Sequence, residues 1–180
     1  LHDALPIYFV GATVREDLKQ GNKERGYQLT DFDKNKKVLL VMGGSLGSKK
    51  LNNIIRQNIE ALLHDYQIIH LTGKGLVDDS INKKGYVQFE FVKDDLTDLL
   101  AITDTVVSRA GSNAIYEFLS LRIPMLLIPL GLDQSRGDQI DNAKNFESKG
   151  YGRHIPEDQL TEVNLLQELN DIELHRESII

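Results

Sequence analysis

Two short segments, far apart in the chain, each consist of an apolar strand, a small-residue turn and the start of a helix. The first is V-L-L-V-M-G-G-S-L-G-S at 38–48, and the second is V-V-S-R-A-G-S-N-A-I-Y-E at 106–117. A turn of this kind brings backbone N–H groups and the positive end of a helix up to a bound phosphate. Two such turns in one small domain indicate a nucleotide-diphosphate ligand held between strand ends.

Strand and helix patterns alternate along the rest of the chain. A continuous apolar run at 38–42 is typical of a parallel strand buried on both faces. Further strands are predicted at 67–71, 87–91, 105–107 and 125–128, and a last short strand is expected at 152–155. Apolar residues at helical spacing predict helices at 51–63, 96–100, 115–119, 139–148 and 160–169. This order predicts an α/β fold, Rossmann-like, with a mostly parallel sheet and helices on both faces. Ligands of such sheets lie outside the carboxyl ends of the strands, where both turns fall.

Composition narrows the class of protein further. A length of 180 residues suits one domain, and a net charge of −6 argues against nonspecific nucleic-acid binding. The chain has no cysteine, and its five histidines show no ligand spacing, so we expect neither a metal site nor a cofactor. No apolar run approaches the roughly 20 residues that span a bilayer. These features suit a cytoplasmic protein.

The first turn, G-G-S-L-G at 43–47, is the weaker phosphate signal. Glycine lets a ligand approach the backbone closely, and Ser45 adds a hydroxyl donor. The alternative is a tight strand-to-helix turn with no ligand. The dinucleotide fingerprint does not fit, because Ser45 stands where its third position needs glycine. The second strand also ends in H-L-T, without the acidic residue that would hold an adenosine ribose, so a nicotinamide enzyme is disfavoured.

The second turn is the sharper motif. The first helical turn is expected to consist of Gly111, Ser112, Asn113 and Ala114, whose N–H groups have no backbone carbonyl as acceptor within the helix. Glu117 lies about one turn further along, where a carboxylate can accept hydrogen bonds from both hydroxyls of a ribose. The alternative is that Ser112 or Asn113 is an ordinary N-cap and Glu117 a solvated helix carboxylate.

Two further signals are weaker. The run D-Q-S-R-G-D-Q at 133–139 follows a strand, and its Asp and Gln side chains can bind sugar hydroxyls. The alternative is a polar loop with Asp138 as a helix N-cap. Arg15 could neutralise a diphosphate, although a lone arginine is more often a surface residue. The sequence contains neither a nucleophile elbow nor a Walker lysine loop.

Together these motifs resemble the C-terminal half of the MurG family, the peptidoglycan glycosyltransferases that add GlcNAc to lipid I. The matching segments are G-A-T-V-R at 11–15, G-G-S-L-G-S at 43–48, S-R-A-G-S-N-A-x-x-E at 108–117, I-P-M-L-L-I-P at 123–129 and S-R-G-D-Q-x-x-N-A at 135–143. The resemblance runs from about residue 8 nearly to the end. It implies one half of a GT-B fold, in which residues 1–15 are an N-terminal remnant and interdomain segment and residues 16–180 are the UDP-GlcNAc-binding domain.

The resemblance also implies a donor site, made of Arg15, Gly44, Ser45, Val92, Ala110, Gly111, Ser112, Asn113, Ala114, Glu117, Asp138 and Gln139. Ser45 would approach the diphosphate, Glu117 would hold the ribose, and the backbone of Val92 would meet the uracil. Gln139, with Asp138 beside it, would bind hydroxyls of GlcNAc. Residues 110–114 would line the diphosphate and the sugar through backbone N–H groups, and Arg15 would reach the donor from the interdomain segment.

The chemistry that the resemblance implies is inverting and metal-independent transfer from UDP-GlcNAc to lipid I, which yields lipid II. A helix N-terminus can stabilise the leaving diphosphate without a metal. The family carries its general base, acceptor site and membrane-facing surface in its N-terminal half, at the inner face of the cell membrane. No catalytic residue is therefore expected in this chain, and we expect it to bind donor but to have little or no transferase activity alone.

Two other functions remain open from the sequence. The chain could be a non-catalytic UDP-sugar-binding sensor, or a natural half-enzyme that needs a separate subunit. A sensor would bind UDP-GlcNAc without any gain in transfer when an N-terminal half is supplied. A UDP-GlcNAc epimerase, which shares the GT-B fold, is disfavoured by the S-R-G-D-Q run.

Overall fold

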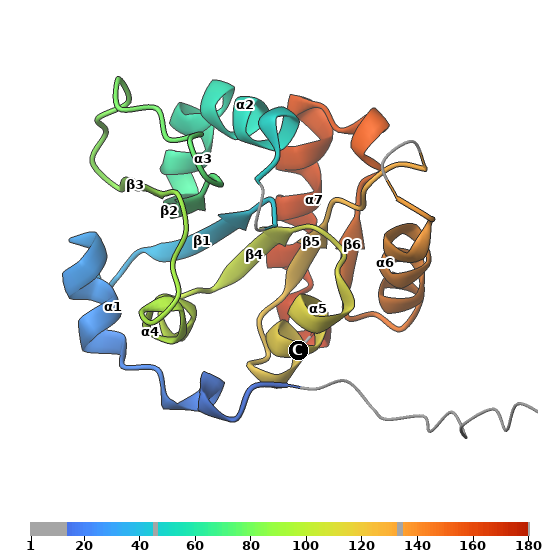
Figure 1. Cartoon of the computed structure of the whole chain (residues 1–180), viewed down its shortest axis with the longest axis horizontal. Coiled ribbons are helices and arrows are strands. Elements are labelled where there is room, and N and C mark those ends of the chain that lie inside the picture. The colour runs from blue at the N-terminus through green and yellow to red at the C-terminus, as the bar shows by residue number, and fades with distance from the viewer. Residues whose placement is uncertain (1–13, 45–46, 133–134, 180) are drawn as a thin grey trace, which may run out of the picture.

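A single parallel sheet, covered by helices on both faces, organises the chain (Figure 1). This computed structural model describes residues 14–44, 47–132 and 135–179. Over these residues the strands are β1 (Lys37–Met42), β2 (Tyr66–Leu71), β3 (Tyr86–Phe89), β4 (Thr105–Ser108), β5 (Met125–Leu127) and β6 (Gly152–His154). The α-helices are α1 (Lys23–Thr30), α2 (Lys49–Gln57), α3 (Ile59–Asp65), α4 (Leu96–Ala101), α5 (Ser112–Ser120), α6 (Asp138–Ser148), α7 (Glu162–Leu174) and α8 (Arg176–Ile179), and the 3-10 helices are η1 (Glu16–Gln20) and η2 (Glu157–Gln159).

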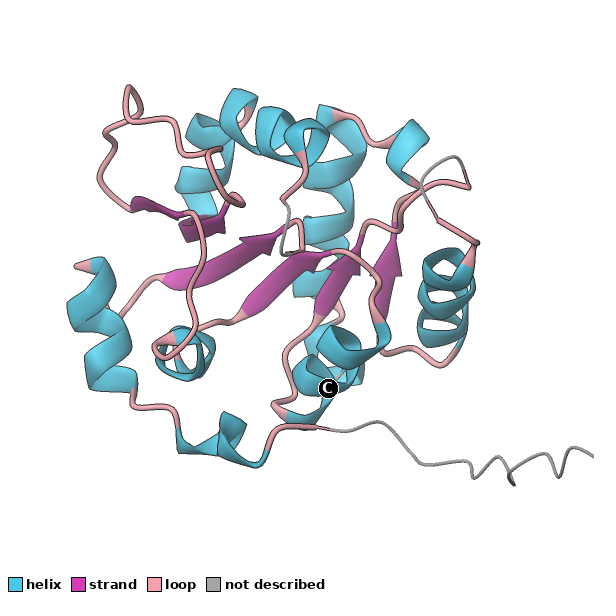
Figure 2. Cartoon of the chain, in the orientation of Figure 1, coloured by secondary structure: helices cyan, strands magenta, loops and turns pink. Residues whose placement is uncertain are grey.

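The strand order across the sheet is β3-β2-β1-β4-β5-β6, and every neighbouring pair is parallel. The chain moves outward from β1 in one direction, then returns to β4 on the other side of β1 and continues outward (Figure 2). That reversal between β1 and β4 leaves a crevice at the carboxyl ends of the two strands. The predicted Rossmann-like α/β fold is confirmed.

The core lies in two layers, one on each face of the sheet. Successive side chains of β1 alternate between them, because strand side chains point to opposite faces with a period of two. Val38 and Leu40 join the cluster covered by α4, α5 and α6, whereas Leu39 and Val41 join the cluster covered by α2, α3 and α7 (Figure 1). All four side chains have 0% exposure, which explains why β1 is apolar at every buried position rather than at alternate ones.

The helix expected at 51–63 is two helices, α2 and α3, separated by Asn58. The side-chain amide of Asn58 donates to the carbonyl oxygen of Ile54 over 2.8 Å, and the backbone N–H of Asn58 donates to the same oxygen over 3.2 Å. Asn58 itself has φ −109° and ψ 12°, outside helical values. Asparagine offers the backbone this alternative to helix geometry, so the apolar spacing continues across a break that the pattern does not reveal.

The segment before β1 folds into η1 and α1, for which the apolar pattern gives no prediction. The buried residues of α1 are Gly26 and Thr30, so this helix has no apolar stripe to detect. A Cβ on Gly26 would lie 2.4 Å from the carbonyl oxygen of Asp98 in α4. The two helices therefore pack backbone against backbone at this glycine.

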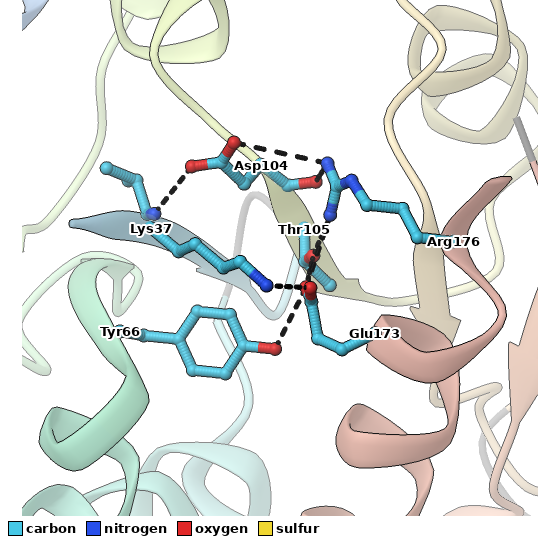
Figure 3. Close-up of polar contacts among 7 residues, drawn as sticks. Lys37, Tyr66, Asp104, Thr105, Glu173 and Arg176 are labelled. Carbon is cyan, nitrogen blue, oxygen red and sulfur yellow. Dashed lines mark hydrogen bonds and ion pairs between the residues drawn. The ribbon is translucent and has the colours of Figure 1, made fainter. Parts of the chain in front are cut away.

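A half-buried carboxylate anchors the C-terminal helices to the amino-terminal edge of the sheet (Figure 3). Glu173 of α7 accepts from the hydroxyl of Tyr66 at 3.2 Å, from the hydroxyl of Thr105 at 3.0 Å and from Arg176 at 3.2 Å, and it pairs with Lys37. Burial raises the pKa of Glu173, but hydrogen bonds from Lys37 and Thr105 and the charges of Lys37 and Arg176 outweigh it, so the pKa is lowered. Burial and the Glu173 charge raise the pKa of Tyr66, which keeps its hydroxyl a donor.

The lowered pKa of Glu173 predicts a pH-dependent contribution to stability. A carboxylate whose pKa is lower in the folded state stabilises the fold above its unfolded pKa and loses this contribution as pH falls through the folded pKa. We expect Glu173→Gln to lower the free energy of unfolding by about 1–2 kcal/mol at pH 7. The deficit should shrink as pH falls below the unfolded value of 4.5. Urea unfolding of both proteins between pH 7 and pH 3 tests this, with the exposed Glu177→Gln as the control. A deficit that stays constant over this range would contradict it.

Candidate functional site

An open cavity of about 660 Å³ lies at the carboxyl ends of β1 and β4, where the strand order reverses. It is lined by Met42, Gly43, Gly44, Gly47, Ser48, Lys49, Lys50, Ser108, Arg109, Gly111, Ala114, Leu130, Gln139 and Glu157. Four of the described residues predicted to bind the donor are among them: Gly44, Gly111, Ala114 and Gln139. The two small-residue turns that the sequence singles out thus contribute to one cavity.

The first turn needs glycine at two positions. Gly44 and Gly47 have φ of +87° and +73°, which side chains rarely adopt, and Gly47 N donates to the Gly44 carbonyl over 3.0 Å. Ser48 then caps α2, since its hydroxyl accepts from the backbone N–H of Leu51. The predicted contact of Ser45 lies outside the described residues.

A buried polar network supports this turn from behind. Asn52 of α2 donates from its amide to the carbonyl oxygen of Thr72 over 2.9 Å and accepts from the ring of His70 over 3.0 Å. The other ring nitrogen of His70 lies 2.8 Å from the hydroxyl of Tyr86. Burial, with a smaller contribution from the charge of Arg56, lowers the pKa of His70 to about 3. The ring is therefore neutral at pH 7, with one nitrogen donating and one accepting.

The second turn leads into α5 through Gly111, which occupies the N-cap position with an extended backbone. No side chain of the described residues caps this helix, so the reading of Ser112 or Asn113 as an ordinary N-cap is wrong. Both residues are exposed, and the N–H groups of the first turn face the edge of the sheet that carries the cavity. Ala110 is fully buried, and its carbonyl oxygen accepts from the Asn142 side chain over 3.0 Å.

Glu117 lies further along α5, and its carboxylate has a partner. Arg15, the residue before η1, donates from Nε to Oε1 of Glu117 over 3.1 Å. The Glu117 side chain is 18% exposed and that of Arg15 is 40% exposed. The reading of Glu117 as a solvated helix carboxylate is therefore wrong. The fold thus joins two predicted donor-site residues that are 102 positions apart in the sequence.

The third predicted segment leads into α6. Gly137, with φ +94°, is the N-cap of α6, so Asp138 is its first residue and not its cap. Gln139 lines the cavity, and its side-chain oxygen accepts from the backbone N–H of Leu130 over 3.1 Å. Val92 follows β3 and packs, half-buried, against the core cluster under α4 and α5. Residues 133 and 134 lie outside the described part of the chain.

One residue of the site has no role in the sequence analysis. Arg109 follows β4 and lines the cavity, although it is only 8% exposed. Its guanidinium donates to Glu157 of η2 over 2.5 Å, to the hydroxyl of Ser48 over 2.8 Å and to the carbonyl oxygen of Ile128 over 3.1 Å. Arg109 therefore ties the second turn to the first turn, to the end of β5 and to η2. In the sequence, the role of Arg109 is indicated only by the place of a charged residue directly after a buried strand, because the partners of Arg109 are remote in sequence.

The described residues contain no group of three His, Cys, Asp or Glu side chains that could hold a metal ion. Over the same residues, no helix is long and apolar enough to cross a membrane. What the geometry offers chemically is a set of helix N-termini and backbone donors around a cavity. Such donors bind anionic groups and stabilise negative charge that develops on them.

Known proteins define the class to which this fold and site belong. The family model of the glycosyltransferase family 28 C-terminal domain matches residues 38–180, so the chain belongs to that family. The MurG structure from Acinetobacter baumannii matches with a TM-score of 0.68 at 20% identity, over 98% of this chain and 50% of that chain. At this identity, the match supports the GT-B type of fold alone.

Curated relatives are much more similar in sequence. The UDP-N-acetylglucosamine--N-acetylmuramyl-(pentapeptide) pyrophosphoryl-undecaprenol N-acetylglucosamine transferase of Staphylococcus haemolyticus is 82% identical over 172 residues, 96% of this chain and 48% of that protein. The Staphylococcus saprophyticus enzyme of the same name is 76% identical over 173 residues, with the same coverage. The chain thus spans about half the length of these relatives. The resemblance to the MurG family is confirmed.

Proposed function

We propose that this chain is the UDP-GlcNAc-binding domain of an inverting transferase that moves GlcNAc onto lipid I in peptidoglycan synthesis. The observation that carries the proposal is the convergence of two glycine turns and the N-terminus of α5 on one cavity at the β1–β4 reversal. The proposal is further supported by the names of the relatives at 82% and 76% identity, which specify this donor sugar and this class of acceptor. Because the chain covers half of those proteins, transfer itself is proposed to need the remaining half.

The proposed ligand contacts follow the order of groups in a nucleotide sugar. The diphosphate lies between the turn at 43–48 and the N–H groups at the start of α5. The uracil lies toward Val92, and the ribose hydroxyls donate to Glu117. GlcNAc lies toward Gln139 and Asp138, at the start of α6.

The proposed chemistry is displacement at the anomeric carbon. The acceptor hydroxyl attacks this carbon, its bond to the diphosphate oxygen breaks, and UDP leaves with the bonding electrons. The positive end of α5 and the backbone donors stabilise the charge that develops on the leaving group. The base that takes the acceptor proton and the surface that meets the inner face of the membrane are assigned to the other half, beyond an interdomain segment at residues 1–15.

Calorimetric titration of this chain with UDP, UDP-GlcNAc and UDP-glucose tests the proposal. We expect uridine-selective binding, and we expect Glu117→Gln to weaken UDP binding by about 30-fold, since one or two hydrogen bonds to a charged group contribute roughly 2 kcal/mol or more. Glu177→Gln makes the same charge change at an exposed position of α8, which contacts the start of β4 through Arg176, and should leave binding unchanged. Equal binding by both variants would exclude Glu117 as the ribose ligand.

Addition of the N-terminal half distinguishes a transferase domain from a UDP-sugar sensor. A transferase domain should form lipid II from lipid I and UDP-GlcNAc when that half is supplied, and little or none without it. Donor binding with no gain in transfer on adding the N-terminal half would favour the non-catalytic alternative.

A further inference from the structure

The ion pair between Arg15 and Glu117 joins the entry of the chain into this domain to the helix that carries the proposed ribose ligand. The two residues are 102 positions apart, and Nε of Arg15 donates to Oε1 of Glu117 over 3.1 Å. Hydrogen bonds between residues so distant in sequence form only where the fold holds both backbones in place. The pair is also not a fully solvated one, because the Glu117 side chain is 18% exposed.

The backbone of Arg15 is held by the segment that follows it. Leu18 of η1 is 2% exposed and belongs to the core cluster, and a Cβ on Gly21 would lie 2.1 Å from the carbonyl oxygen of Thr97 in α4. The segment around η1 therefore fits closely against α4. Arg15 approaches α5 from this fixed base.

We propose that Arg15 is a positioning residue that orients the Glu117 carboxylate to receive the ribose hydroxyls of the donor. This inference rests on the proposed function of Glu117. A carboxylate has about four lone-pair positions on its two oxygens. The Nε of Arg15 takes one of them on Oε1, which leaves Oε2 and the second position on Oε1 for two hydroxyl donors.

The advantage of this arrangement is preorganisation. A glutamate side chain on a helix surface samples several rotamers, and a ligand must restrict them before it can form paired hydrogen bonds. The ion pair restricts them before the ligand arrives. The nucleoside end of the site then depends on the position of the segment that enters the domain, and not on α5 alone.

The test separates action on the ribose from action on the diphosphate. Dissociation constants of UDP and of 2′-deoxy-UDP are measured by calorimetry for the wild-type chain and for Arg15→Gln, Arg15→Lys and Glu117→Gln. We expect the wild type to prefer UDP and Glu117→Gln to lose the preference. Arg15→Gln should reduce the preference about tenfold, the effect of one rotamer-rich side chain that must be ordered. Arg15→Lys keeps the charge and a donor, and should restore part of the preference.

Two results would overturn the inference. Arg15→Gln could weaken UDP and 2′-deoxy-UDP by the same factor, which would assign Arg15 to the diphosphate. It could instead tighten UDP binding, which would mean that the ion pair competes with the ribose. Failure of the proposed function looks different from both, because the wild-type chain would then bind neither nucleotide. Since Arg15 is 40% exposed, the thermal unfolding midpoints of its variants should match that of the wild type.

Discussion

Replacing Arg109 with methionine is expected to lower the free energy of unfolding by about 3–5 kcal/mol, the usual cost of breaking a buried ion pair from one side. Arg109 is 8% exposed, and its guanidinium donates to three groups, including Glu157, which is also 8% exposed. Methionine fills a similar volume but leaves a buried carboxylate that has lost its arginine. It also removes the donor to Ser48, the cap of α2 at the first turn.

Urea unfolding at pH 7 measures this cost, and two further variants show its origin. Arg153→Met removes ion pairs with Asp171 and Glu168 in which the arginine side chain is 40% exposed, so it should cost less than about 1 kcal/mol. The double variant Arg109→Met/Glu157→Gln should recover part of the loss, because it also removes the buried charge. If Arg109→Met and Arg153→Met cost the same, the Arg109 pair does not hold the edge of the site together.

Replacing Gly47 with alanine is expected to cost about 3 kcal/mol or more, the sum of a left-handed backbone and an overpacked contact. Gly47 has φ +73°, and a Cβ there would lie 2.1 Å from the carbonyl oxygen of Thr72 and 2.9 Å from the Cα of Gly73. Both contacts are with backbone, which cannot rotate away as a flexible side chain would. The Thr72 carbonyl is also held by the Asn52 amide. The first turn must therefore move, and we expect nucleotide binding to fall along with stability.

Gly44→Ala provides the matched control in the same turn. Gly44 has a similar φ of +87°, but a Cβ there would meet nothing within 4 Å. Only the backbone cost should remain, about 1–2 kcal/mol. Urea midpoints of the two variants give the comparison. Equal midpoints would mean that the close approach of Gly47 to Thr72 adds nothing to the loss of stability in Gly47→Ala.

Local patterns in the sequence predict most of the architecture. The apolar run at 38–42 predicts a strand buried on both faces, and β1 has that burial. Parallel strands need crossover connections, and the regular alternation of strands and helices supplies them, which is why this order indicates a parallel sheet. The break at Asn58 and the glycine-mediated packing of α1 were not predictable, because each depends on a single side chain or on its absence rather than on a period.

The candidate site divides in the same way. Gly44, Gly111 and Ala114 were predicted to lie near a ligand because small residues after strands of a parallel sheet meet at one edge, and they line one cavity. Nothing near Arg109 in the sequence indicated Glu157, which lies 48 residues away, and nothing near Glu117 indicated Arg15.

By itself, the sequence determined the class of fold, the edge of the sheet that carries the site and the family to which the chain belongs. The fold class and the edge of the sheet follow from periodicity and from turn chemistry, which act over a few neighbouring residues, and the family follows from the resemblance of the motifs to those of known members. Only the tertiary structure decided which charged side chains pair with one another. Such pairs form between elements that are brought together by burial of the two apolar faces of the sheet. The hydrophobic effect that drives this burial is non-directional, so a local motif does not show which distant side chains will meet.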